Sequence, residues 1–136
     1  MTTTYLVDTD WVIHYLNGRQ DIVERLEVLK PEGLGLSVVS LAELYEGVYY
    51  SRDPEGDERG LNDFLQGITL LGLDEETAKI FGQERGRLRS AGMIIGDFDL
   101  LIAATALQYH LTLLTNNRGH FERIDGLRII YERNQG

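Results

Sequence analysis

Short apolar runs alternate along this chain with segments whose apolar residues recur at helical spacing. The runs at Tyr5–Asp8 and Leu34–Val39 are rich in apolar or β-branched residues, as buried strands are. Similar runs lie at Ile68–Leu73, Leu111–Thr115 and Leu127–Tyr131. Strands that alternate with helices predict a mostly parallel sheet covered by helices on both faces. We therefore expect an α/β fold with three layers, α/β/α, around a central sheet of four to five strands.

Helices are predicted between these runs. The first is expected to begin at Thr9 or Asp10, which have N-capping side chains. The third is expected to be capped by Ser40, where Glu43 completes a capping-box pattern. The polar segment 52–57 is predicted to be a loop. After the first helix, which ends before Gly18, the expected helices are 21–29, 41–51, 58–66, 74–90 and 97–109.

The length and composition of the chain describe an ordinary globular domain. Its 136 residues suit one domain, 1–136, with a substantial core. No apolar run approaches the roughly 18–20 residues of a membrane span, and the N-terminus lacks the basic region of a signal peptide. We expect a cytoplasmic protein with no membrane partner. The absence of cysteine excludes disulfides and thiolate metal ligands.

The net charge of −9 bears on what the chain binds. Because nucleic-acid binding depends largely on Lys and Arg, an acidic chain is expected to repel phosphate. One interpretation is a solvated acidic surface with a small-molecule or protein partner. The other is that some carboxylates bind a divalent cation, which reverses the local charge. The bulk charge does not choose between them, whereas the positions of the acidic residues do.

Acidic and amide residues lie where the predicted strands end or the next helices begin. In a parallel sheet these ends meet at one edge, where ligands bind, so residues far apart in the sequence are expected to converge. Each residue alone has an ordinary explanation, because an Asp at a helix start is usually a cap and Glu43 completes a capping box. The residues concerned are Asp8, Glu43, Asp97, Asp99, Asn116 and Asn117.

Carboxylates that gather in one place repel one another unless a cation binds them. Magnesium takes oxygen ligands, typically one or two carboxylates completed by water and substrate phosphate, and it orients water for attack on a phosphodiester. We expect Asp8 and Asp99 to bind metal directly, with Glu43 and Asp97 as further possible ligands. Glu43 would hold a metal-bound water or act as a base, and Asn117 would bind through water. Weaker candidates for substrate contact are Thr115, Asn116 and His120.

Four segments of the chain resemble the PIN-domain family, and within it the VapC toxins of toxin–antitoxin pairs. They are Tyr5–Asp10, Ser37–Leu44, Ile95–Ala106 and Leu114–Phe121, in the order and spacing of that family. The resemblance implies a magnesium- or manganese-dependent endoribonuclease that cleaves tRNA or ribosomal RNA. It also implies a cognate antitoxin that blocks the site, and a homodimer or a hetero-oligomer with the antitoxin.

The chain departs from that family pattern at two positions. The position of Asn117 is often Asp in PIN domains, so the fourth carboxylate is missing and a second metal site is weakened. Asp97 stands where many relatives carry Pro, and it is either a ligand or the cap of its helix. Whether one or two metal ions act stays open.

Two other functions fit parts of the sequence. The segment Asp8–Val12 imitates the nucleophile motif of haloacid dehalogenase-type phosphatases. That family needs a lysine to hold the phosphoryl group, and neither Lys30 nor Lys79 follows a suitable strand. The other alternative is a PIN-like binding module that has lost catalysis, which Asn117 and the acidic surface would fit.

Two groups of side chains have a structural and a functional interpretation. Arg85, Arg87 and Arg89 would contact RNA phosphate or line a solvated helix. Tyr45, Tyr49 and Tyr50 would stack on bases or, as the resemblance implies, meet a partner chain.

Overall fold

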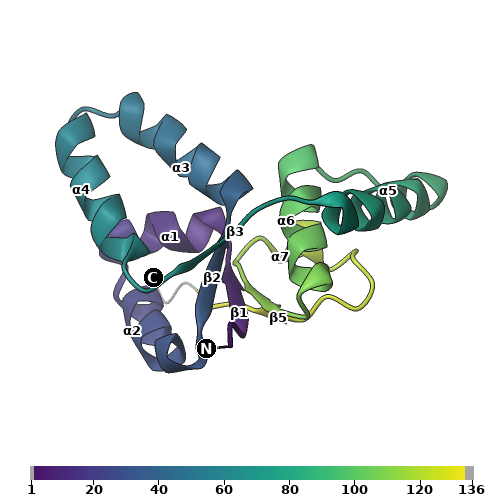
Figure 1. The fold of residues 1–136 in the computed structure, drawn as a ribbon, viewed down its shortest axis with the longest axis horizontal. Helices are drawn as coiled ribbons and strands as arrows, with labels where there is room; N and C mark the ends of the chain where they lie inside the picture. Colours follow the sequence, from purple (N-terminus) through teal and green to yellow (C-terminus); the bar gives the residue numbers. More distant parts are fainter. Residues whose placement is uncertain (1, 134–136) are drawn as a thin grey trace.

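A five-stranded parallel sheet forms the centre of the computed structural model, which describes residues 2–133 (Figure 1). The strand order is β3-β2-β1-β4-β5, and every neighbouring pair is parallel. The predicted α/β fold and its sheet are therefore confirmed. The strands are β1 (Tyr5–Val7), β2 (Leu34–Ser37), β3 (Thr69–Leu71), β4 (Thr112–Leu114) and β5 (Ile129–Ile130).

Helices cover the two faces of this sheet (Figure 1). One face carries α1 (Thr9–Leu16), α2 (Gln20–Leu29), α3 (Val38–Tyr49) and α4 (Pro54–Leu65), and a 3-10 turn, η1 (Lys30–Glu32), precedes β2. The other carries α5 (Glu75–Ser90), α6 (Asp97–Gln108) and α7 (Arg118–Phe121). The α3–α4 pair and α5 extend away from the sheet on opposite sides, with the start of α6 between them.

Two hydrophobic clusters, one on each face, hold the layers together. Successive strand residues point to opposite faces, and Leu6 and Val7 accordingly belong to different clusters. The same holds for Leu113 and Leu114 in β4. Trp11 of α1 is fully buried in the cluster beneath α1–α4. Central strands buried on both faces explain why their sequences read as continuous apolar runs.

The junction between β2 and α3 differs from the prediction. The strand ends at Ser37, whose hydroxyl accepts a hydrogen bond from the Val39 backbone N–H at 3.0 Å and so caps α3. Ser40 is therefore not the cap. It lies buried within α3, and its hydroxyl has no hydrogen-bond partner in the described part of the chain. As a consequence Glu43 lies in the second turn of α3 and not in a capping box.

Other predicted boundaries also change because side-chain caps act where the pattern did not place them. Asp8 itself caps α1, in place of Thr9 or Asp10, by accepting a hydrogen bond from the Thr9 backbone N–H. The expected loop 52–57 is partly helix, since Asp53 caps α4 and Pro54 occupies its first turn. The short helix α7 was not predicted at all.

The order of the strands creates one special point at the carboxyl edge. From β1 the chain proceeds through β2 and β3 toward one side of the sheet, and β4 and β5 lie on the other side. The direction therefore reverses between β1 and β4, which is where open α/β sheets bind ligands. Within residues 2–133, none of the helices is both long enough and apolar enough to cross a membrane.

Candidate active site

Asp8 lies at the point where the strand order reverses. The register of β1 and β4 pairs Val7 with Leu114, and the Asp8 backbone N–H donates to the Leu114 carbonyl at 2.9 Å. This pairing puts Asp8 next to Thr115, whose hydroxyl donates to Asp8 Oδ2 at 2.7 Å. The side chains of Asp8 and Thr115 are buried, at 3% and 0% exposure. The sheet thus fixes a carboxylate at its carboxyl edge, as the sequence predicted.

Asp10 is a further acidic residue at this position, and the sequence reasoning did not include it among the site residues. Its Oδ2 accepts a hydrogen bond from the Asn116 backbone N–H at 3.0 Å, and the Thr115 hydroxyl lies 3.4 Å from its Oδ1. The signal for it was present, because an acid two residues after Asp8 lies in the first turn of α1 at the same sheet edge.

Burial and neighbouring charge shift the pKa values of both aspartates upward. Burial and the nearby Asp10 carboxylate raise the pKa of Asp8 to about 7, against the hydrogen bonds from Thr115 and Thr9. The charge of Asp99 raises it further. Burial also raises the pKa of Asp10, against its hydrogen bond from the Asn116 backbone. The folded chain therefore holds several carboxylates whose charged forms are costly together.

Asp99, in the first turn of α6, is close enough to act electrostatically on Asp8. Its Oδ2 lies 2.8 Å from Nδ1 of His120, which belongs to α7. His120 was a weak candidate for substrate contact, and the structure places it at the rim of the site with its side chain half exposed. The short helix α7 is what turns this imidazole toward α6.

Glu43 reaches the same region from α3. The Thr9 hydroxyl donates to Glu43 Oε1 at 2.8 Å, so the chain segment that holds Asp8 also orients Glu43. This hydrogen bond, and not a capping box, is what fixes the Glu43 side chain. Glu43 and Asp99 both line an open hollow of about 420 Å³ that extends to Gly96 and Phe98 at the start of α6.

Asp97 differs from the other acids in its partner and exposure. Its carboxylate pairs with the Arg85 guanidinium of α5, and its side chain is 78% exposed. It is not the helix cap, because Gly96 occupies that position. Arg85 comes from a separate helix, α5, and reaches the start of α6 across the fold. This ion pair satisfies Asp97 without a metal.

The two asparagines after β4 have different positions. Asn116 is structural, because its Oδ1 accepts from the Trp11 indole N–H at 3.0 Å and from the Glu132 backbone N–H at 2.9 Å. Asn117 is exposed and is the N-cap residue of α7, and its backbone N–H donates to Thr115 Oγ1 at 3.0 Å. Its side chain therefore remains available at the rim of the site.

The donor set fits a hard divalent cation. Asp8, Asp10 and Asp99 supply carboxylate oxygens, and none of the ion pairs within residues 2–133 neutralises Asp8 or Asp10. Among the described residues, no group of three acidic or histidine side chains lies close enough together to hold a metal ion by itself. Magnesium does not need such a cage, because one or two carboxylates with water and phosphate suffice.

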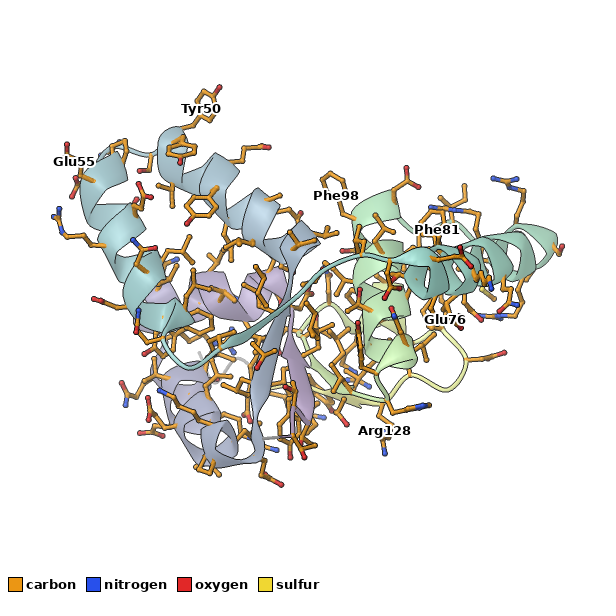
Figure 2. All side chains as sticks on the ribbon, in the orientation of Figure 1. Tyr50, Glu55, Glu76, Phe81, Phe98 and Arg128 are labelled. Carbon is orange, nitrogen blue, oxygen red and sulfur yellow. The ribbon has the colours of Figure 1, made fainter. Side chains whose placement is uncertain are left out.

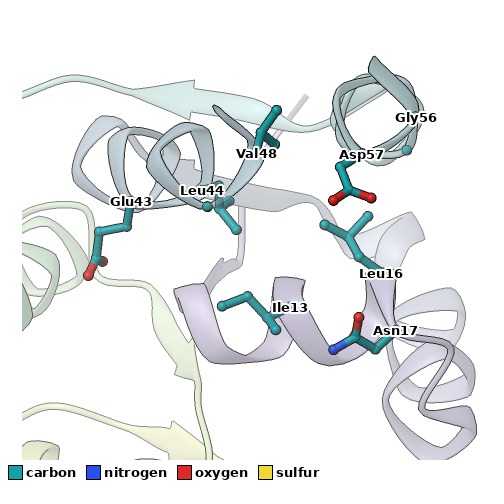
Figure 3. A pocket seen from close by; sticks show the side chains of 10 residues that line it. Ile13, Leu16, Asn17, Glu43, Leu44, Val48, Gly56 and Asp57 are labelled. Carbon is teal, nitrogen blue, oxygen red and sulfur yellow. The ribbon is translucent and has the colours of Figure 1, made fainter. Parts of the chain in front are cut away.

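An apolar groove adjoins the site on the other side of Glu43. It has a volume of about 380 Å³ and lies between α1, α3 and α4. Ile13 and Leu16 of α1 line it together with Leu44 and Val48 of α3. Figure 3 shows Leu44 pointing from α3 toward α1, with Glu43 apart from these side chains at one end of the groove. Ile13 and Leu16 are 45% and 37% exposed, so the groove presents apolar surface to solvent.

The arginine and tyrosine groups lie away from the carboxylates or have local partners. Arg87 pairs with Glu84 at 2.8 Å, and Arg85 pairs with Asp97. Tyr45 and Tyr49 stack on each other along α3, with ring centroids 5.8 Å apart.

Comparison with known proteins agrees with this geometry. The PIN domain family matches residues 5–127. Ribonuclease VapC2 of Rickettsia felis is 34% identical over 125 residues, which cover 90% of this chain and 93% of that protein. The tRNA(fMet)-specific endonuclease VapC of Shigella flexneri is 32% identical over 124 residues, which cover 91% of this chain and 94% of the relative.

Solved structures show the same fold. The structure of VapBC2 from Rickettsia felis bound to a DNA fragment from its promoter contains a chain that superposes with a TM-score of 0.90 at 30% identity, covering 96% of this chain and 100% of that one. DNA-bound VapBC from Salmonella typhimurium gives 0.89 at 30% identity, covering 96% and 98%. A family match across most of the residues, together with these relatives, shows that the chain belongs to the PIN-domain family and is homologous to the VapC ribonucleases.

Proposed function

We propose that this chain is a metal-dependent endoribonuclease and the toxin of a VapBC-type toxin–antitoxin pair, with Mg²⁺ as its cation and Mn²⁺ as a substitute. The observation that carries the metal site is the buried Asp8 carboxylate, which lies beside Asp10 and Asp99 where the strand order reverses. Relatives named as ribonucleases support the reaction. One relative is named for tRNA(fMet), so we propose tRNA as the substrate and the cytoplasm as the place of action, with ribosomal RNA as the second candidate.

The residues of the chain take separate roles in this proposal. Asp8 and Asp99 would hold the cation, and Asp10 would hold its water ligands. When bound, the cation would supply positive charge for the phosphate and lower the pKa of a water molecule. Glu43 is held by the Thr9 hydroxyl and faces the hollow, so it is placed to accept a proton from the attacking water. Asn117 would bind through water at the rim.

Cleavage of total tRNA tests the activity. We expect the purified chain to cut tRNA in Mg²⁺ or Mn²⁺ and to stop in excess EDTA. Asp8→Asn and Asp99→Asn should each lower the rate at least about a hundredfold, in the range for removal of a group that stabilises developing charge. Asp125→Asn is the matched control, because that side chain is 80% exposed in a different loop. Undiminished cleavage in EDTA would contradict the metal proposal, and an inactive but metal-binding wild type would favour the silent binding module.

The apolar groove supports an antitoxin partner. Solved structures of relatives contain VapB with VapC, and we propose that the cognate antitoxin binds this chain through an apolar segment in the groove and a basic residue toward Glu43. Gly47 lines the groove, and a side chain there would enter open space. Gly47→Leu is therefore expected to weaken antitoxin binding while tRNA cleavage continues. If Gly47→Leu binds the cognate antitoxin as tightly as the wild type does, the groove assignment is contradicted.

We also propose a homodimer that forms through the exposed face of α3. Tyr49 and Tyr50 are 61% and 88% exposed there, and large exposed aromatic side chains are typical of interface centres. Sedimentation velocity at micromolar concentration should show a dimer that Tyr49→Glu dissociates. If the wild type and Tyr49→Glu both sediment as monomers, this assignment is contradicted.

A further inference from the structure

We propose that Phe98 is a substrate-positioning residue whose ring stacks on an unpaired base next to the scissile phosphate. The proposal rests on the proposed nuclease function and names a part of the RNA that the site would bind. Phe98 precedes Asp99 in the first turn of α6 and lines the hollow of about 420 Å³ together with Glu43 and Asp99. Its position therefore links an aromatic ring directly to the carboxylate site.

The ring is exposed although it is apolar. Phe98 is 57% exposed, and Figure 2 shows it projecting from the start of α6 on the side toward α3. Within α6 the apolar residues that follow it are packed in the core, since Leu100 and Ile102 are fully buried, whereas Ile94 in the preceding loop is also exposed. The helix thus buries its apolar face and leaves one large ring at the opening of the site, where a planar partner has access to it.

The loop that precedes this ring is held by hydrogen bonds to its carbonyl groups. Arg85 Nη1 donates to the Ile95 carbonyl at 2.9 Å, and Arg123 Nη1 donates to the Ile94 carbonyl at 2.8 Å. Arg87 in turn donates to the Arg123 carbonyl at 2.7 Å. These contacts fix the chain where it enters α6, so the position of Phe98 is set before a ligand arrives. A preordered ring loses less entropy when a base stacks on it.

Electrostatics give a reason for an aromatic contact at this site. The chain carries a net charge of −9, and Asp8, Asp10 and Asp99 make its site acidic. Apart from the contact made through the bound cation, contacts to phosphate therefore give little affinity for RNA. Stacking does not depend on charge, and every base has a face that can stack. A stacked base must be unpaired, so the cut bond should lie in a single-stranded loop or bulge.

Steady-state cleavage tests the proposal. Cleavage of total tRNA identifies which tRNA and which bond are cut. A synthetic stem-loop around that bond then serves as the substrate for kinetics. Phe98→Ala should raise KM about tenfold, as loss of one stacked base does, with kcat within about twofold. Phe98→Tyr and Phe98→Trp should restore KM, whereas Phe98→Leu should not. Tyr109→Ala is the control, because it removes an exposed ring at the opposite end of α6.

An abasic substrate separates stacking from other effects. Replacing the base on one side of the cut bond by an abasic nucleotide should raise the KM of the wild type about tenfold and leave the KM of Phe98→Ala unchanged. The proposal would be overturned if the abasic nucleotide, placed on either side of the cut bond, raised the KM of the wild type and of Phe98→Ala by the same factor. A full rescue by Leu would also overturn it, as would a Phe98→Ala protein that sediments as a smaller species than the wild type, since the ring would then belong to a contact between copies. A wild type that cuts no RNA would overturn the nuclease function itself, and this is seen before any variant is compared.

Discussion

Replacing Asp8 by Asn should make the metal-free protein more stable while it removes activity. The Asp8 pKa rises on folding from its ordinary value of 3.8 to about 7, chiefly because the carboxyl group is buried. Each pKa unit corresponds to about 1.4 kcal/mol, so the ionised carboxylate costs the folded state about 4 kcal/mol. An Asn side chain carries no charge, it is an equally good N-cap, and it can keep a hydrogen bond with Thr115.

The pH dependence of this gain has a defined sign. Because the folded state binds the Asp8 proton more tightly than the unfolded state, the carboxyl group favours folding fully below pH 3.8, and this contribution is lost as the pH rises through about 7. The free energies of unfolding of Asp8→Asn and wild type should therefore agree near pH 4. They should differ by about 4 kcal/mol at pH 8.

Urea unfolding in EDTA at several pH values between 4 and 8 measures this difference. Asp125→Asn is the control, since it removes a carboxylate that is 80% exposed in a different loop. Addition of Mg²⁺ should stabilise the wild type by mass action and leave Asp8→Asn unchanged. A variant that is less stable than the wild type at pH 8 in EDTA would refute the reasoning, because the buried carboxylate would then stabilise the fold by itself.

Three further substitutions test the surroundings of the site. Asp97→Asn should leave tRNA cleavage within about twofold, because its carboxylate pairs with Arg85 at an exposed position; a loss as large as that expected for Asp8→Asn would show that it is a ligand. Thr115→Val removes the hydroxyl that donates to Asp8, so it should raise the pKa of Asp8 further. The acid limb of the rate–pH profile should then move to higher pH. If the acid limb stays where it is in the wild type, Thr115 does not have this role. Asn116→Ala leaves two N–H groups without their acceptor and should lower the free energy of unfolding by about 1–3 kcal/mol in urea, whereas an unchanged midpoint would show that water replaces it.

The sequence was sufficient for the sheet and for most of the acidic site. The apolar runs identified the strands, and parallel pairing of Val7 with Leu114 brings the ends of β1 and β4 together as the general rule requires. Asp8 and Asp99 therefore converge as predicted, although their sequence positions are far apart. This rule depends on the order of strands and helices and not on where each begins and ends. Errors in the predicted helix starts therefore did not change the predicted edge of the sheet.

Contacts between separate elements could not be derived from the pattern. Ser37 and Ser40 are both good N-caps, and only the end of β2 decides that Ser37 caps α3. The Arg85–Asp97 pair joins α5 to the start of α6, so a search for basic residues near Asp97 in the sequence misses it. His120 meets Asp99 because the short helix α7 turns it there, and a four-residue helix has too little periodicity to predict.

Binding of Mn²⁺ followed by electron paramagnetic resonance tests the central proposal, a cation site built on Asp8, most directly. The free ion gives a strong signal that falls on binding, so the titration counts sites without any RNA. We expect the wild type and Asp125→Asn to bind Mn²⁺ with the same affinity, Mg²⁺ to compete, and Asp8→Asn to lose binding at least about tenfold. Equal binding by Asp8→Asn, or no binding by the wild type at millimolar Mn²⁺, would contradict the account.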